Sequence, residues 1–185
     1  MGESLDEYRT YLENLAAQKS PTLFSNGGKD YASILMSILL KNTTHSVHMF
    51  CEGFKPDLIK QHDYWEALTE YLNQKDKELH VIVNTNSYCD QLPLQTLFNV
   101  QRARGNDSIQ VRLISEEGRE KIKKQFNGAL NNFAVFDKNM YRLEYEPSDY
   151  KAFGSFNDPK DSELLLNLFN EVFNLSKDIN GAIAQ

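Results

Sequence analysis

Cysteine is scarce in this sequence, and a long apolar run and an excess of basic residues are both missing. The two cysteines, Cys51 and Cys89, form no motif, and two thiols in 185 residues fit a reducing compartment better than a disulfide framework. The longest mainly apolar run, Tyr31 to Leu40, is about half as long as a membrane span requires. No basic segment leads into an apolar stretch near residue 1, as it would in an export signal. We therefore expect a cytoplasmic protein with no membrane segment.

The balance of charge is acidic, with a formal net charge of -6 from 20 basic and 26 acidic residues. This argues against a broad basic surface for duplex nucleic acid, because neutralising phosphates supplies much of the non-specific affinity. It leaves room for a local basic pocket. Apolar residues make up 41% of the chain and charged residues 25%, values typical of globular proteins and not of disordered ones.

The length of 185 residues predicts one domain with its own hydrophobic core. We expect an N-terminal helix and turn over residues 1–28 and the core over residues 29–185. Helical spacing of apolar residues alternates along the chain with short β-rich runs. Helices are predicted over Leu5–Ala17, Asp30–Lys41, Tyr64–Leu72, Leu94–Arg102, Glu117–Phe126 and Asp161–Leu175. Strands are predicted over Ser46–Cys51, Leu79–Val83, Gln110–Ile114, Asn132–Phe136, Met140–Tyr145 and Tyr150–Ser155.

The order of these elements indicates the fold class. Strand, helix, strand, helix, strand is the pattern of a parallel sheet with crossover helices, so the class is α/β. A turn at residues 137–139 makes the next two strands a β-hairpin. The last helix has an apolar stripe, which we expect to dock on the sheet and to be essential for folding: Leu164, Leu165, Leu168, Phe169, Val172 and Phe173. Asp158 or Asn157 can cap its first free amides, and Pro159 is tolerated at a helix start.

Two short segments in the last third carry a family resemblance. An apolar run, Phe133–Phe136, leads into Asp137, and Gly154-Ser155-Phe156-Asn157 follows further on. With the order of elements, these segments resemble the phospholipase D superfamily, in which a strand carries His-x-Lys, an Asp follows after four more residues, and a Gly-Ser-x-Asn comes later. The resemblance implies a mixed sheet with helices on both faces. It also implies that such half-domains pair, giving a homodimer or a larger assembly.

The departures from that pattern concern the catalytic residues. Counting back from Asp137, Asn132 stands at the Lys position and Leu130 at the His position. The family's reaction needs an imidazole to attack phosphorus and a Lys to hold the phosphoryl oxygens, and these two residues supply neither. The chain also inserts about one strand, Tyr141-Arg142-Leu143-Glu144, where the family has a shorter gap. We therefore predict a degenerate site with no catalytic residue, no metal and no cofactor. All four histidines lie outside this segment: His45, His48, His62 and His80.

Arg142 and Glu144 are two residues apart on a predicted strand, so their side chains share one face. Arg142 could bind a phosphate or carboxylate, with Glu144 orienting it or contacting a ribose or base. The alternative is a solvent-facing ion pair of little energetic value. Ser155 and Asn157 match family positions that line the pocket. We expect Arg142, Glu144, Ser155 and Asn157 to converge on an anionic ligand, such as a nucleotide or a nucleic-acid end, and Arg142→Ala to leave the fold intact.

Other patterns have simpler structural explanations. Asn26-Gly27-Gly28-Lys29 lacks the first Gly and the following Ser or Thr of a phosphate loop, and predicts a turn and a helix start. His45 and His48 point to opposite faces of a strand, which argues against a metal pair. In parallel sheets ligands sit beyond the carboxyl ends of the strands, where this chain has polar residues: Glu52, Asn84, Asn86 and Ser115.

Three functions remain open at this point. The first is a pseudoenzyme, a binding, sensing or scaffolding module for a phosphate-containing ligand or a partner protein, in a bacterial nuclease- or defence-type system by analogy of fold. The second is an active phosphodiesterase or nuclease with a rebuilt site. The third is an interaction subunit that binds only other protein chains.

Overall fold

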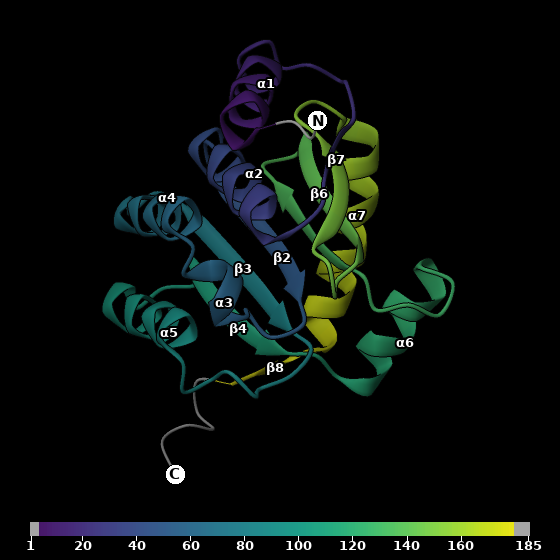
Figure 1. The fold of residues 1–185 in the computed structure, drawn as a ribbon. Helices are drawn as coiled ribbons and strands as arrows, with labels where there is room; N and C mark the ends of the chain where they lie inside the picture. The colour runs from purple at the N-terminus through teal and green to yellow at the C-terminus, as the bar shows by residue number, and fades with distance from the viewer. Residues whose placement is uncertain (1–3, 180–185) are drawn as a thin grey trace.

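A single mixed sheet organises the computed structural model, which describes residues 4–179 (Figure 1). Within those residues eight strands follow the order β1-β7-β6-β5-β2-β3-β4-β8. The strands are β1 Phe24–Asn26, β2 Ser46–Cys51, β3 Glu78–Val83, β4 Ile109–Leu113, β5 Asn132–Phe136, β6 Met140–Glu146, β7 Lys151–Ser155 and β8 Lys177–Asp178. The helices are α1 Leu5–Ala17, α2 Lys29–Lys41, α3 Pro56–Ile59, α4 His62–Asn73, α5 Leu92–Arg104, α6 Glu116–Gln125 and α7 Pro159–Leu175.

The sheet joins a parallel half to an antiparallel half. β2, β3 and β4 run parallel, with α4 and α5 as the crossovers between them. β5 pairs antiparallel with β2, and β5, β6 and β7 then form an antiparallel meander. This confirms the predicted α/β class, the mixed sheet and the hairpin. The sequence prediction had omitted β1, β8 and α3, which are too short for periodicity to detect.

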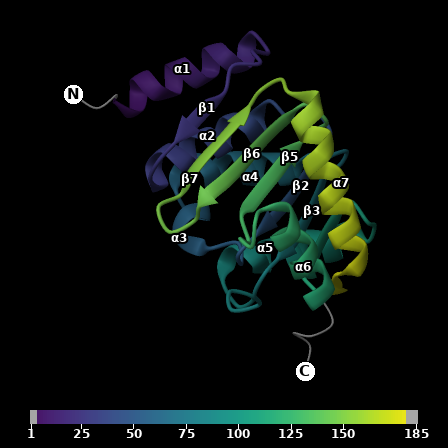
Figure 2. The same ribbon diagram turned by 90° about the vertical axis from the view of Figure 1, so that its right-hand side faces the viewer.

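Helices cover both faces of the sheet, as predicted (Figure 2). One face lies under α1, α2, α4 and α5, which share a buried apolar cluster with the sheet. The helix α2 is apolar nearly all round, and nine consecutive residues from Ala32 to Leu40 are buried. The other face lies under α6 and α7, around Phe50, Ile82 and Phe169. These helices leave part of the outer face of β6 and β7 uncovered in Figure 2, although Tyr141 and Ser155 on that face are buried.

Local sequence explains where the helices begin. Ser4 caps α1 by accepting a hydrogen bond from the Glu7 amide, and its own amide donates to the Glu7 carboxylate in return. Asp158, one of the two residues predicted to do so, caps α7 by accepting from the Asp161 amide at 3.1 Å. The predicted stripe of α7 is correct except at Leu164, which is 57% exposed.

Asp137 fastens the β5–β6 turn to the start of β2. Its carboxylate accepts hydrogen bonds from the amides of Thr44, His45 and Ser46, at 2.8–3.0 Å, and from the Thr44 hydroxyl. Burial alone would raise the pKa of Asp137, but these hydrogen bonds outweigh it and hold the pKa below its usual value. The Asp of the motif is therefore an ionised structural anchor, and it stands at the opposite end of β5 from Asn132.

We predict that α7 stabilises the sheet through one face only. Phe169→Ala should lower the free energy of unfolding by about 3–5 kcal/mol, because this fully buried ring packs against His48 and Phe173. Leu164→Ala, on the exposed face of the same helix, should change it by less than about 0.5 kcal/mol. Urea denaturation followed by the fluorescence of Trp65 measures both. Equal effects of the two substitutions would contradict this packing.

Candidate functional site

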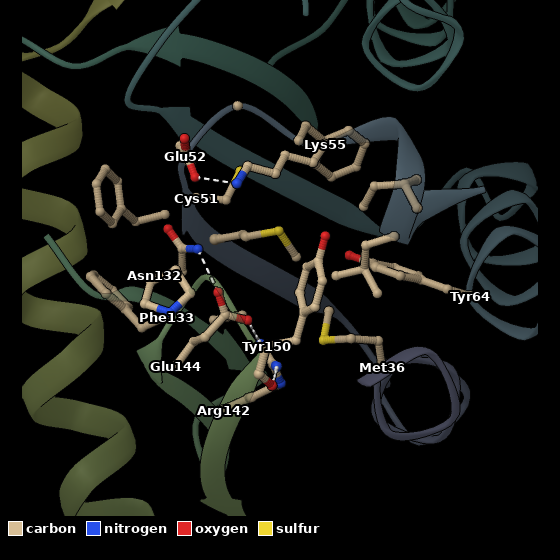
Figure 3. Close-up of a pocket in the computed structure, with 18 residues that line it drawn as sticks. Met36, Cys51, Glu52, Lys55, Tyr64, Asn132, Phe133, Arg142, Glu144 and Tyr150 are labelled. Atoms are coloured by element: carbon tan, nitrogen blue, oxygen red, sulfur yellow. Dashed lines mark hydrogen bonds and ion pairs between the residues drawn. The ribbon is translucent and has the colours of Figure 1, made fainter. Parts of the chain in front are cut away.

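A small pocket opens where β2 ends and β5 begins (Figure 3). Its volume is about 60 Å³. The strands supply Cys51 and Asn132, and the segment Glu52–Ile59, which includes α3, closes it from outside. Most of the lining is apolar, with Met36, Met49, Phe54, Leu58 and Ile59 among it. A few polar groups in an apolar hollow are typical of ligand sites.

Strand register brings the polar groups of the pocket together. Asn132, the first residue of β5, lies directly opposite Glu144 of β6. Arg142 is two residues before Glu144, so both side chains point to the face that α2 covers. Gly154 of β7 lies beside Arg142, where a Cβ atom would collide with the Tyr141 carbonyl and the Phe24 ring. The absence of a side chain at Gly154 therefore lets β1, β6 and β7 pack closely behind the pocket.

Arg142 and Glu144 form a buried ion pair. The guanidinium lies 2.9 Å from the Glu144 carboxylate, and the two side chains are only 7% and 4% exposed. The other Glu144 carboxylate oxygen accepts a hydrogen bond from the side-chain amide of Asn132 at 2.7 Å. Arg142 also donates to the Asn26 side chain and to the Tyr150 carbonyl, both at 3.2 Å. The solvent-facing alternative is therefore wrong, because the pair is enclosed and each charge has several partners.

Two further contacts hold the outer wall of the pocket. Lys55 pairs with Glu52 at 2.5 Å, and Tyr150 donates its hydroxyl proton to Asp57 of α3 at 2.6 Å. Burial tends to lower the pKa of Lys55, but the hydrogen bond and charge of Glu52 outweigh it, so the pKa is raised. Burial and the Asp57 carboxylate both raise the pKa of Tyr150. The lysine is thus charged and the phenol protonated at neutral pH.

The pocket lining offers no group suited to attack phosphorus at neutral pH. Burial raises the pKa of the Cys51 thiol to about 12, so the reactive thiolate is rare. Burial also raises the pKa of the Tyr64 phenol. The lining contains no histidine. His48 packs on the opposite face, against Phe169 of α7, where burial and then nearby His80 lower its pKa to about 4.

Ser155 and Asn157 lie away from this pocket, so the expected convergence with Arg142 is wrong. Ser155 is opposite Tyr141, whereas Arg142 is opposite Gly154, and alternate residues point to opposite faces of a sheet. The Ser155 hydroxyl accepts a hydrogen bond from the Asn157 amide beneath the start of α7. The inserted β6 also stands between β7 and β5. Whether either residue binds a ligand there stays a prediction.

Of the polar residues at the carboxyl ends of the parallel strands, only Glu52 lines the pocket. Asn84 accepts a hydrogen bond from Arg119, and Ser115 caps α6. The Gly27-Gly28-Lys29 segment leads into α2. Three pocket residues had no distinguishing sequence signal: Cys51, Lys55 and Tyr150. Asn132 was identified only as the replacement for the family's Lys.

A metal site and a membrane-spanning helix are both absent from the described residues. Between residues 4 and 179, no group of three or more His, Cys, Asp or Glu side chains is placed to hold a metal ion. In the same part of the chain, no helix combines the length and apolar character that crossing a membrane demands.

Comparison with solved structures decides the fold. Nuc from Salmonella typhimurium, a phospholipase D family member, superimposes with a TM-score of 0.58 at 13% identity, over 85% of this chain and 98% of Nuc. The chain has the phospholipase D-like fold. NucT from Helicobacter pylori matches with a TM-score of 0.56 at 10% identity, over 85% of this chain and 99% of NucT. No protein-family model and no curated protein matches the sequence.

The phospholipase D-like fold also matches a chromatin protein. TrmBL2, described as an archaeal chromatin protein with a novel mode of DNA binding, has a TM-score of 0.61 at 10% identity. The alignment covers 94% of this chain but only 61% of TrmBL2. At such identities the likeness concerns the fold, and the site must be judged on its own residues.

We predict that Arg142 is required for folding, contrary to the expectation from sequence. Arg142→Met should lower the free energy of unfolding by about 3–5 kcal/mol, because it leaves Glu144 buried without its cation. Arg142→Met combined with Glu144→Leu should recover much of that loss, since no unpaired charge remains. The control is Arg9→Met, which breaks the half-exposed pair with Asp63 and should cost less than about 1 kcal/mol. Urea denaturation of the four proteins measures this, and an Arg142→Met variant as stable as wild type would contradict it.

Proposed function

We propose that this chain is a catalytically inactive phospholipase D-like domain that binds a phosphate-containing ligand, a nucleotide or a nucleic-acid end. The observation that carries the proposal is the pocket at the start of β5. There Asn132 contacts Glu144 where the family has its Lys, and Leu130 stands where it has its His. A site without a nucleophile, yet with a cluster of buried polar groups, supports binding rather than turnover.

The pocket supports a ligand that offers both donors and acceptors. Arg142 supplies N–H donors, while Glu144 and Asn132 supply acceptor oxygens within the same hollow. A nucleotide carries both kinds of group on its base and ribose. The fold shared with two proteins named Nuc and NucT favours a nuclease-related or defence-type setting in bacteria, which we propose by analogy only. The free thiols Cys51 and Cys89 favour a cytoplasmic location.

An active phosphodiesterase with a rebuilt site is the less favoured alternative. It would need a nucleophile in the pocket lining, and the candidates there are the Cys51 thiol and the phenols of Tyr64 and Tyr150. All three are protonated at neutral pH, since burial raises their pKa values. None has a histidine beside it in the pocket to remove its proton.

We predict no turnover of phosphodiester substrates by the purified protein. Bis(p-nitrophenyl) phosphate and single-stranded DNA should both stay intact at micromolar protein concentration, because no residue of the pocket can form the covalent intermediate. Calorimetric titration with nucleoside monophosphates and short oligonucleotides should instead show binding. Asn132→Leu should abolish it, and Thr10→Val, on the exposed face of α1, should not. Hydrolysis that Asn132→Leu abolishes and Thr10→Val retains would contradict the proposal.

A second copy of the chain is the partner that we propose. The resemblance implies pairing of half-domains, and the uncovered outer face of β6 and β7 carries apolar side chains: Leu143, Tyr145 and Phe153. Tyr145 is 50% exposed and its ring lies 6.1 Å from that of Phe153. One face placed against its symmetry mate makes an isologous interface, in which the same side chains meet their own copies. If no ligand binds, this surface favours the interaction-subunit function.

We predict that the purified chain is a dimer held through this face. Tyr145→Glu should shift it to the monomer in sedimentation equilibrium, because it would place a charge at the centre of an apolar contact. Tyr11→Glu, at a tyrosine of α1 that is 40% exposed, should leave the dimer unchanged. A wild-type monomer, or a dimer that survives Tyr145→Glu, would rule out this interface.

A further inference from the structure

Tyr150 separates two hollows of the molecule. On its inner side lies the pocket of about 60 Å³ with Asn132, Arg142 and Glu144. On its outer side lies an open cleft of about 510 Å³, which Gly27, Gly28, Lys29 and Lys151 border together with the carboxylates of Asp57 and Asp149. Tyr150 lines both hollows, and Figure 3 shows it at the wall of the inner pocket. Movement of this one side chain would therefore decide whether the two hollows are connected.

Tyr150 is held by hydrogen bonds at its side-chain hydroxyl and at its backbone carbonyl. Its hydroxyl donates to Asp57 of α3 at 2.6 Å, and its backbone carbonyl accepts from Asn26 at 2.6 Å and from Arg142 at 3.2 Å. It adopts a φ of 54°, a left-handed conformation that costs energy in a tyrosine. Both hydrogen bonds to the carbonyl are partly buried, whereas the hydrogen bond of the hydroxyl is exposed. The Tyr150–Asp57 bond is thus the contact that opens most readily.

The charges of the inner pocket are already balanced. Arg142 is paired with Glu144, and Lys55 with Glu52. A phosphate entering the pocket would have to separate one of these pairs, and would meet a second carboxylate at close range. An uncharged planar group meets no such obstacle, because it can pack on the apolar lining and bond to Asn132 and Glu144 in place. The edges of nucleobases carry adjacent donors and acceptors of this kind.

We propose that the inner pocket receives the base of a nucleotide, not its phosphate, and that Tyr150 with α3 forms a gate that opens to admit it. This rests on the proposed function, since it assigns one part of that ligand. The closed pocket is too small for a base: an engineered cavity of roughly 150 Å³ is needed to take benzene. Once the Tyr150–Asp57 bond is broken, the pocket and the outer cleft become one site, and the remainder of the nucleotide extends into the open cleft.

Tyr150→Phe tests the gate without removing the ring or the backbone carbonyl. Hydrogen exchange of the α3 amides, of which Ile59 and Lys60 are bonded to Lys55 and Pro56, should become about tenfold faster in this variant. Tyr11→Phe, the same substitution at an exposed tyrosine of α1, is the matched control and should leave α3 unchanged. Unchanged exchange in Tyr150→Phe would overturn the gate.

Binding of the four ribonucleosides, their 5′-monophosphates and inorganic phosphate tests the base assignment. A nucleoside should bind to wild type and accelerate exchange in α3, because the complex holds the gate open. Its affinity should rise about tenfold in Tyr150→Phe, since less energy is spent on opening. Binding of phosphate and of all monophosphates alike, with no nucleoside bound, would overturn the base assignment and leave the proposed function standing. No binding of any probe to either protein would contradict both.

Discussion

The buried ion pair between Arg142 and Glu144 is the constraint on which the candidate site depends. Two opposite charges inside a sheet are stable only if other polar groups satisfy them with hydrogen bonds. Asn132, Asn26 and the Tyr150 carbonyl make three such hydrogen bonds, and they come from β5, β1 and the β6–β7 turn. The pair therefore joins segments that are far apart in the sequence into one wall of the pocket. It also explains why the short strand β1 is held at the edge of the sheet.

The sequence predicted the long elements well, because each carries its own periodicity. The bounds of Leu5–Ala17, Ser46–Cys51 and Asn132–Phe136 agree with the structure residue for residue. Elements of two to four residues were not predicted, because β1 and β8 form only through pairing with β7 and β4. The mixed sheet followed from the family resemblance, which rested on the order of elements, the strand before Asp137 and the Gly154–Asn157 segment together.

The candidate site was predicted only in part, for reasons of register. Arg142 and Glu144 share a face because they are on one strand, which the sequence alone determines. Their burial depends on α2 and on β1 beside them, which it does not. To predict which face Ser155 points to, one must follow the alternation of side chains along β6, through the turn and into β7. The irregularity between Glu144 and Glu146 interrupts that alternation. A shift of one position there reverses the face, and Ser155 indeed points the other way.

The two edges of the sheet have a consequence for how this molecule can assemble. An exposed edge strand is a template to which further strands can add, and long flat edges lead to filaments and aggregates. Within residues 4–179 one edge is the three-residue strand β1, and at the other edge the two residues of β8 pair with only Arg112 and Leu113 of β4. The hydroxyl of Tyr8 also occupies the carbonyl of Ser25 on the β1 edge. Such short edge strands disfavour open-ended assembly by strand addition. Association is then expected through the faces of the sheet, where a closed symmetry limits the number of copies.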